Sequence, residues 1–309
     1  MRVVVALGGN ALSPARGTGS VEEMREALTA TAKALADLVA AGTSLVLTHG
    51  NGPQVGRLLL QQELAADEVP PMPMDVCGAL SQGQIGYLVA QALDNALRRR
   101  RLEARVLTLV TQVVVDGRDP AFRRPSKPVG PSYERPVAQA IAQTSGHVFA
   151  IQRDGRWRRV VASPEPVRFV EQGPLVALVD SGNVVVAAGG GGVPVVEHRG
   201  QLRGVEAVVD KDRSAALLAQ AVGADLLLIL TEVERVQTGF GTPSARVLDQ
   251  LTVAQARALL TAGEFPEGSM GPKVEACVRF VETGGRAAIG SLSQAAAVLA
   301  GTAGTAFIP

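Results

Sequence analysis

Lysine is rare in this chain, and its placement is the first indication of chemistry. The chain has 30 basic residues, of which four are lysines and the remaining 26 are arginines. Since arginine serves nearly every ordinary cationic role here, a retained lysine indicates a place where a compact ammonium group fits and a planar guanidinium does not. Phosphates around a reaction centre are such a place, and chance retention is the alternative. The four residues are Lys33, Lys127, Lys211 and Lys273.

Charges of both signs alternate around Lys211, which lies between Asp210 and Asp212 just before an expected helix. One interpretation is a salt-bridged surface turn, which would contribute little. In the other, an aspartate fixes an ammonium group that faces a transferring phosphate, and a carboxylate can also reach Mg²⁺ carried by a nucleotide. Lys273 and Lys127 lie in similar loops rich in proline and glycine. Three such groups favour phosphoryl transfer, which depends on alignment and positive charge and requires no protein nucleophile.

Glycine-containing loops follow three expected strands, at the position where open α/β sheets bind ligands. In the first two loops, backbone amides can approach an anion, although the first is equally compatible with an ordinary tight turn. The third contains four consecutive glycines, whose entropic cost indicates that something approaches the backbone closely. The candidate substrate- or phosphate-binding residues are Gly8, Gly9, Asn10, His49, Gly50, Asn51, Gly52, Gly189, Gly190 and Gly191.

His49 is not predicted to be a general base. It has no carboxylate or nucleophile at a recognisable spacing, so a hydrogen-bonded structural role is favoured.

Two familiar types of nucleotide site are not predicted either. The four glycines do not form a GxGxxG motif followed by a ribose-binding acid, and there is no GxxxxGK[ST] loop. The sequence therefore predicts neither a dinucleotide fingerprint nor a Walker-type site.

Apolar strands alternate with helices along most of the chain, which predicts a parallel sheet buried on both faces. A capping box of Ser20 and Glu23 predicts the start of the first helix, which is expected to end near Gly42. Further helices are expected near 78–100, 212–222, 253–262 and 272–283. The expected strands are 3–7, 44–48, 106–109, 184–188, 226–230 and 287–289.

Residues 116–166 differ from the rest, being rich in arginine and proline. A hairpin is predicted there from strands 148–152 and 157–161, turning at Asp154 and Gly155. We interpret this segment as a lobe inserted into a single domain that spans 1–309.

Composition excludes several classes of protein. With 47% hydrophobic and 19% charged residues, the chain is a well-cored globular protein, and its net charge of +1 gives no broad basic field for nucleic acid. The run Arg98–Arg101 closes a helical stretch and is interpreted as solvated surface. Cys77 and Cys277 lack CxxC spacing, so neither a disulfide framework nor a zinc site is indicated, and a reducing cytoplasm fits best. No signal sequence or membrane span is predicted.

Taken together, these residues resemble carbamate kinase, a member of the amino-acid-kinase superfamily, over nearly the full chain. It extends from Met1 to the closing stretch Gly301–Ile308. The resemblance rests on the segments Ala6–Ala11, His49–Val55, Thr111–Asp116, Lys127–Pro131, Gly189–Pro194, Gly204–Asp212 and Gly268–Lys273, and on Gln82, Gly83, Ile85, Gly86 and Tyr87.

The resemblance implies a three-layer αβα sandwich around a mainly parallel eight-stranded sheet, with a small protruding subdomain that corresponds to the inserted lobe. It implies reversible phosphoryl exchange between ATP with Mg²⁺ and carbamate, giving ADP and carbamoyl phosphate, with a homodimer as the working form. No direct protein ligand to the metal is implied.

The resemblance also implies roles for individual residues. The position of Asp212 organises Lys211 and Lys273, and Lys127 reaches the site from the lobe. Other branches of the superfamily have a lysine where this chain has Ala6, and Lys127 can supply that charge. Nucleotide contacts are implied for Asp210, Thr231, Met270 and Lys273.

One departure concerns the adenine site, where the family usually has an aromatic residue soon after the strand at 226–230. Here no aromatic residue occurs before Phe240. Two alternatives stay open at this point: another small-acid or phosphonate kinase on the same scaffold, and a non-catalytic regulator that binds nucleotides or anions.

Overall fold

The computed structural model describes residues 1–12, 17–266 and 268–309, and it places the expected strands in one eight-stranded sheet. All neighbouring pairs run parallel except β16 and β17. The predicted mainly parallel sheet is thereby confirmed. Its spatial order is β15 (Gln250–Thr252), β17 (Thr305–Ile308), β16 (Arg286–Ser291), β12 (Leu226–Thr231), β1 (Arg2–Leu7), β2 (Ser44–His49), β9 (Val184–Val186) and β3 (Val106–Thr108).

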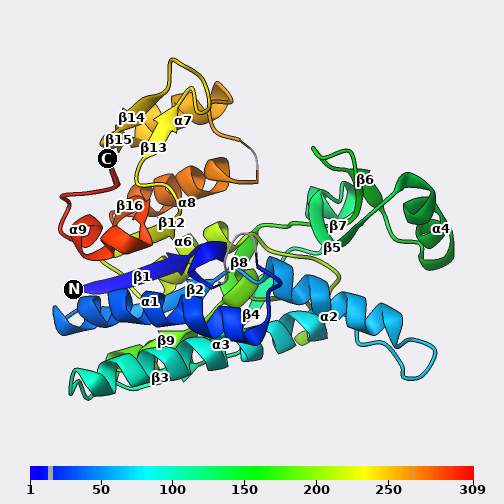
Figure 1. Ribbon diagram of the computed structural model, residues 1–309, viewed down its shortest axis with the longest axis horizontal. Coiled ribbons are helices and arrows are strands. Elements are labelled where there is room, and N and C mark those ends of the chain that lie inside the picture. The colour runs from blue at the N-terminus through cyan, green and yellow to red at the C-terminus, as the bar shows by residue number, and fades with distance from the viewer. Residues whose placement is uncertain (13–16, 267) are drawn as a thin grey trace.

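Helices cover both faces of this sheet (Figure 1). Along β1, Val3 and Val5 belong to one buried cluster while Val4 and Ala6 belong to the other. Because side chains alternate across a strand, this division requires an apolar layer on each side. On the first side lie α1 (Val21–Ala40), α3 (Met74–Arg99) and α9 (Ala295–Leu299), and on the second α5 (Gln172–Asp180), α6 (Lys211–Ala221), α7 (Val253–Thr261) and α8 (Met270–Glu282).

Local signals set the helix starts. The Ser20 side chain accepts from the Glu23 amide and the Glu23 side chain accepts in return, so the predicted capping box is confirmed. Helix α3 begins four residues earlier than expected, directly after Pro73, which serves as its N-cap. Helix α2 (Gly52–Leu64) extends from the second glycine loop, with Pro53 in its first turn.

The lobe forms its own three-stranded antiparallel sheet, β5 (Lys127–Tyr133), β7 (Trp157–Val161) and β6 (Phe149–Ile151), with α4 (Arg135–Ser145) packed on it. The hairpin of β6 and β7 matches the predicted one. Figure 1 shows these elements at one end of the molecule, well beyond the edge of the main sheet.

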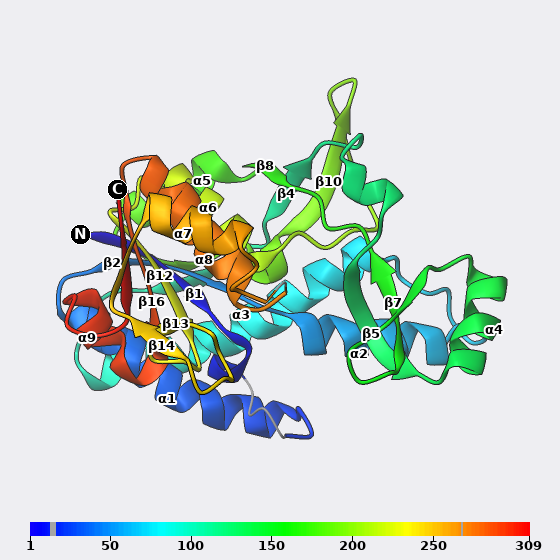
Figure 2. The ribbon, with the colours of Figure 1, turned by 90° about the horizontal axis from the view of Figure 1, so that it is seen from above.

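The chain enters and leaves the lobe through a second, four-stranded sheet. Strand β4 (Gln112–Val115) precedes the lobe and β8 (Pro166–Phe169) follows it, and the two pair with each other. The sheet continues through β10 (Val193–His198) to β11 (Gln201–Gly204), a hairpin that projects from the body in Figure 2. A small hairpin of β13 (Val236–Thr238) and β14 (Arg246–Leu248) lies at the top of Figure 1, beside β15.

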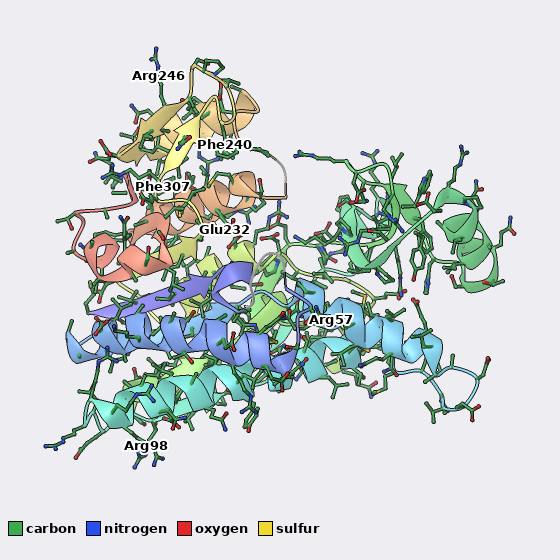
Figure 3. The ribbon with its side chains drawn as sticks, viewed as in Figure 1. Arg57, Arg98, Glu232, Phe240, Arg246 and Phe307 are labelled. Atoms are coloured by element: carbon green, nitrogen blue, oxygen red, sulfur yellow. The ribbon has the colours of Figure 1, made fainter. Side chains whose placement is uncertain are left out.

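Two surface expectations can be compared with this structure. Arg98, Arg99 and Arg101 are exposed at the far end of α3 from the lobe, and Figure 3 shows Arg98 at that end. Their solvated character is as predicted. None of the helices in the described ranges combines the length and the apolar character that a transmembrane span needs.

Candidate active site

The carboxyl ends of four neighbouring strands, β12, β1, β2 and β9, carry the loops of the site. Gly8 follows β1 and donates its backbone N–H to the Leu230 carbonyl oxygen at 3.0 Å, which ties the first loop to the end of β12. A Cβ on Gly8 would lie 3.0 Å from that oxygen, whereas one on Gly9 would meet nothing within 4 Å. Gly9 therefore faces open space, as a group that receives a ligand must.

The ammonium groups of Lys211 and Lys273 converge on one carboxylate, that of Asp212. Nζ of Lys273 lies 2.8 Å from Oδ2 of Asp212, and Nζ of Lys211 lies 3.0 Å from Oδ1. Lys211 also donates to the Leu7 carbonyl oxygen at 3.2 Å, at the end of β1. Lys211 is the first residue of α6 and Lys273 lies in the first turn of α8, and these two helices pack side by side. Helix packing thus brings together residues that are far apart in the sequence.

Burial gives this cluster its electrostatic character. Burial alone would raise the pKa of Asp212, but the ammonium groups of Lys211 and Lys273 outweigh it, and the pKa lies below its ordinary value. Burial lowers the pKa of Lys211, against the opposing effect of the Asp212 carboxylate. Two cations around one buried anion leave a net positive centre, which suits a phosphoryl group.

Lys127 reaches the same place from the lobe. Its Nζ lies 2.6 Å from Oδ2 of Asp210, whose Oδ1 accepts from the Asp212 amide at 2.9 Å and caps α6. Two aspartates that are two residues apart, Asp210 and Asp212, therefore form ion pairs with all three lysines.

At three of the glycines after β9, neighbouring protein atoms leave no room for a side chain. A Cβ on Gly189 would lie 2.5 Å from the His49 ring, and one on Gly190 would lie 2.2 Å from the Asn51 amide nitrogen. A Cβ on Gly191 would lie 2.2 Å from the Val209 carbonyl oxygen. The strand ends at Val186, two residues earlier than expected. The close approach to the backbone that the four glycines indicated is present. The approaching atoms belong to the protein itself, to the side chains of His49 and Asn51 and the backbone of Val209.

Two cavities meet at Lys273. The smaller, of about 270 Å³, contains the candidate phosphate loops, and the larger, of about 430 Å³, extends toward β13. They share Thr231, Gly268 and Lys273. Among the candidate residues, the smaller cavity is lined by Gly8, Gly9, Gly50, Asn51, Gly52, Lys127, Gly190, Asp210, Lys211, Asp212, Thr231 and Lys273.

Comparison with known proteins assigns the chain to a family. A carbamate kinase from Thermococcus kodakarensis is 49% identical over 308 residues, covering 98% of each chain. A carbamate kinase from Pyrococcus horikoshii is 47% identical, covering 100% of this chain and 99% of its own. The sequence profile of the "Amino acid kinase family" matches residues 1–291. The chain belongs to the amino acid kinase family.

A solved structure supports the same assignment. Carbamate kinase from Giardia lamblia bound to AMP-PNP is 40% identical, with a TM-score of 0.94 over 99% of this chain and 98% of that chain. The three-layer fold expected of an amino acid kinase is therefore confirmed.

The lobe of this amino acid kinase is seated on the core by several contacts besides Lys127. Arg159 forms an ion pair with Glu206, and the Val208 amide donates to the Ala162 carbonyl oxygen at 2.9 Å. The Tyr133 hydroxyl donates to the Glu63 carboxylate at 3.1 Å. Burial, together with that carboxylate, raises the pKa of Tyr133 to about 12, so the hydroxyl keeps its proton.

His49 lies behind the loops of the family site and does not line either cavity. It is 1% exposed, and its Nδ1 lies 2.9 Å from the Gly50 carbonyl oxygen. Burial lowers its pKa to about 4, so the ring is neutral at pH 7. This environment agrees with the structural role favoured for His49.

Other candidate residues fall around the two cavities. Met270 lines the larger one, while Gly189 and Gly191 lie behind the smaller. The side chain of Asn10 lies outside the described part of the structure.

The wall of the larger cavity contains residues that the sequence did not single out. Phe265 is buried and lines it together with Phe240, which is 66% exposed. Figure 3 labels Phe240 and Glu232, which both line this cavity. The pair Phe265–Pro266, just before the Lys273 loop, is the signal that could have indicated an aromatic wall. The remaining residues in this wall that were not among the candidate site residues are Val233, Arg235, Gln237, Gly268 and Ser269.

A ring of charges lies outside the site and joins the same two helices. Each arginine of the ring contacts both glutamates: Arg213 lies 2.6 Å from Glu165 and 3.2 Å from Glu275, and Arg279 lies 2.6 Å from each. Arg213 follows Asp212 on α6, Glu275 follows Lys273 by two residues on α8, and Glu165 stands at the root of the lobe. We refer to these four residues as the outer ring.

The donor set of this kinase can be tested for a metal. No group of three or more His, Cys, Asp or Glu side chains in the described ranges is arranged to hold an ion. Both carboxylates in the cavity already pair with lysines. These residues fit Mg²⁺ that is held largely by nucleotide phosphates, and they do not form an all-protein cage.

Proposed function

We propose that the chain catalyses reversible phosphoryl transfer between ATP and carbamate, giving ADP and carbamoyl phosphate. The observation that carries the proposal is the pair Lys211 and Lys273, held on opposite oxygens of Asp212 where two cavities meet. Its relatives at 47–49% identity over nearly the full chain carry the name carbamate kinase. One cavity suits a nucleotide and the other a small acid.

Direct transfer needs the two substrates in line and positive charge around the moving group. In this proposal Lys273, at the junction of the cavities, contacts the phosphates of the nucleotide. Lys211 faces the phosphoryl group during transfer, and the backbone amide of Gly9 binds one of its oxygens. Asp212 positions both lysines and does not accept a proton, since its pKa is low.

The nucleotide occupies the larger cavity. Phe240 and Phe265 supply apolar surface for the base, Met270 and Thr231 lie along the same wall, and Asp210 holds Lys127 near the phosphates. Mg²⁺ bound to the nucleotide neutralises charge on the phosphate oxygens.

Residues 116–166 act as a lid in this proposal. The lid delivers Lys127 to the acceptor side of the cavity, and its apolar strand residue Val129 helps exclude water. The charge that other branches of the superfamily place at the position of Ala6 then comes from the lid.

We further propose that the chain works as a homodimer in the cytoplasm. Exposed apolar side chains gather on α3, on the neighbouring edge strand β3 and just after that strand: Leu80, Tyr87, Leu107 and Val110. A second copy is the fitting occupant, because an edge strand beside an apolar helix face can continue pairing across a two-fold axis. Cys77 and Cys277 are free and buried, which suits a reducing compartment.

The decisive assay is ATP formation from ADP and carbamoyl phosphate in the presence of Mg²⁺. We expect turnover with carbamoyl phosphate, and in the other direction turnover with carbamate but not with acetylglutamate or fosfomycin. Absence of ATP formation by a folded protein that binds ADP would contradict the proposal.

A further inference from the structure

Ala188 has a backbone conformation that residues with a side chain rarely adopt. Its φ is +52° and its ψ is +31°, in the left-handed region, where a Cβ causes strain that glycine avoids. The two other non-glycine residues with positive φ in the described ranges, Arg101 and Arg199, are both exposed. Ala188 is instead completely buried, in the apolar cluster on the side of α6 and α8. The fold thus keeps a strained alanine in its core, directly before the four glycines.

Two buried threonines bind the backbone of Ala188. The Ala188 N–H donates to Thr111 Oγ1 at 3.0 Å, and Thr48 Oγ1 donates to the Ala188 carbonyl oxygen at 2.9 Å. Thr111 Oγ1 donates its own proton to the Leu109 carbonyl oxygen at 2.9 Å, so its lone pairs remain for the Ala188 amide. Both threonines are completely buried. Together they fix the peptide groups before and after Ala188.

Thr111 is itself held by Gln82 on α3. The Thr111 N–H donates to Gln82 Oε1 at 2.9 Å, and Gln82 Nε2 donates to the Thr111 carbonyl oxygen at 3.1 Å. Gln82 is buried as well. We refer to Thr48, Gln82 and Thr111 as the inner frame. Side chains from β2, from α3 and from the segment between β3 and β4 thus converge on the backbone of one residue.

The conformation of Ala188 determines the course of the loop beside the smaller cavity. The Gly191 N–H donates to the Ala188 carbonyl oxygen at 3.0 Å, which closes a tight turn that contains Gly190. Gly190 is buried and lines the smaller cavity, and its N–H donates to no acceptor among the described residues. A buried amide without a protein partner is expected to bind an occupant of the cavity beside it. Phosphate oxygens are suitable acceptors.

We propose that the inner frame consists of positioning residues. Thr48 and Thr111 hold Ala188 in its left-handed conformation, and this conformation places the Gly190 amide against the phosphoryl group during transfer. The inference rests on the proposed function and adds to it a set of residues that touch no substrate. The strain at Ala188 allows a test, because glycine adopts the same backbone angles without strain and so depends less on the frame.

Removing the Thr111 hydroxyl while keeping the shape of the side chain tests the frame. We expect Thr111→Val to lower kcat for ATP formation from ADP and carbamoyl phosphate by about tenfold to a hundredfold, because the loop shifts relative to the phosphoryl group. KM for ADP should change by less than about twofold, since the frame does not line the larger cavity. Thr111→Ser keeps the hydroxyl and should retain kcat within about threefold.

Glycine at position 188 should make the hydroxyl dispensable. In the double variant Thr111→Val with Ala188→Gly, kcat should lie within about threefold of that of Ala188→Gly alone. Rates are measured well below the unfolding temperature of each variant. A residue that serves only stability would not give this pattern, because lower stability does not alter the rate constant of molecules that remain folded.

Thr305→Val is the matched control. Thr305 is also completely buried, and its hydroxyl also accepts from a backbone amide, that of Val236 at 2.8 Å, and donates to a carbonyl oxygen, that of Leu248. Its loss of stability in urea titrations should be comparable to that of Thr111→Val, while kcat changes by less than about twofold.

The outcomes separate the two proposals. A kcat of Thr111→Val within about twofold of the unaltered chain would overturn the inference and leave the proposed function intact. A lowered kcat that Ala188→Gly does not restore would overturn the role of the strained alanine. If Thr111→Val does not fold, Thr48→Val decides by the same two comparisons, with an expected loss of about threefold to tenfold. If the unaltered chain forms no ATP from carbamoyl phosphate, the proposed function fails and this inference fails with it.

Discussion

At the scale of single residues, the contact of two ammonium groups with Asp212 is the feature on which the proposed transfer depends. We expect Lys211→Ala and Lys273→Ala each to lower kcat by about two to three powers of ten, the range for losing one preorganised charge contact. Circular dichroism should show that both variants fold. The coupled ATP-forming assay measures the loss.

Lys33 is the internal control for these variants. It is exposed on α1, outside both cavities. Lys33→Ala should retain normal kcat. A comparable loss there would mean that the scarcity of lysine has no connection with the reaction.

His49 predicts a pH dependence of stability. Its pKa is about 4 in the folded protein, against an ordinary value of 6.5. Below pH 6.5 the His49 ring is protonated in the unfolded chain but stays neutral in the folded chain. The free energy of unfolding therefore falls as the pH drops toward 4. Between pH 7 and pH 5 this should remove roughly 2 kcal/mol from the free energy of unfolding. Urea titrations of the unaltered chain and of His49→Gln measure it, and equal pH dependence in both would refute the assignment.

Gly191 predicts a large loss of stability on substitution. Its φ is +96°, and a Cβ there would lie 2.2 Å from the Val209 carbonyl oxygen. Gly191→Ala should lower the free energy of unfolding by more than about 3 kcal/mol. Gly146→Ala is matched in backbone sign, with φ +72° and no atom within 4 Å, and should lose only about 1–2 kcal/mol. Similar losses of free energy of unfolding in the two variants would show that the backbone around Gly191 shifts at little energetic cost to make room for a Cβ.

Residue types predicted the charges of the site better than they predicted its packing. The rarity of lysine and the aspartates beside Lys211 were visible in the sequence. The sequence did not show which atoms crowd the glycines after β9, because only the fold brings His49 and Val209 next to them. The conformation of Ala188 depends likewise on Thr48 and Thr111, which the fold brings to it.

At the scale of elements, the proposed lid brings Lys127 to the acceptor side of the site only when the lobe contacts the rest of the domain. Lys127→Ala should lower kcat by about two to three powers of ten although Lys127 belongs to a separate small sheet. Single-turnover measurements should place the loss in the transfer step. Unchanged turnover would mean that the contact between Lys127 and Asp210 serves only to seat the lobe.

Strands and helices with strong periodicity were predicted within a few residues, as the central strands and α6 to α8 show. Several elements were missed, among them β15 and β17 of the main sheet, which have only three and four residues. Of the others, β10, β11, β13 and β14 form hairpins whose pairing supplies the regularity that their sequences lack. Helix α4 was missed for a related reason, since only Ala138 of it is buried.

At the scale of the whole molecule, the apolar surface of α3 and β3 predicts a dimer. Sedimentation velocity of the unaltered chain should give a dimer, and the double variant Tyr87→Arg with Leu107→Arg should give a folded monomer. Leu64→Arg is the matched control, because Leu64 is the more exposed residue at 79% but lies at the end of α2. A monomeric unaltered chain would contradict the proposed assembly.

The outer ring gives the molecule a mechanical property. Glu165 stands where the lobe rejoins the body, and its partners Arg213 and Arg279 belong to the helices that carry Lys211 and Lys273. If residues 116–166 open as the lid proposed above, these ion pairs transmit the movement to α6 and α8. Opening of the lid and loosening of Lys211 and Lys273 around phosphate would then be one movement, and product release would follow from it.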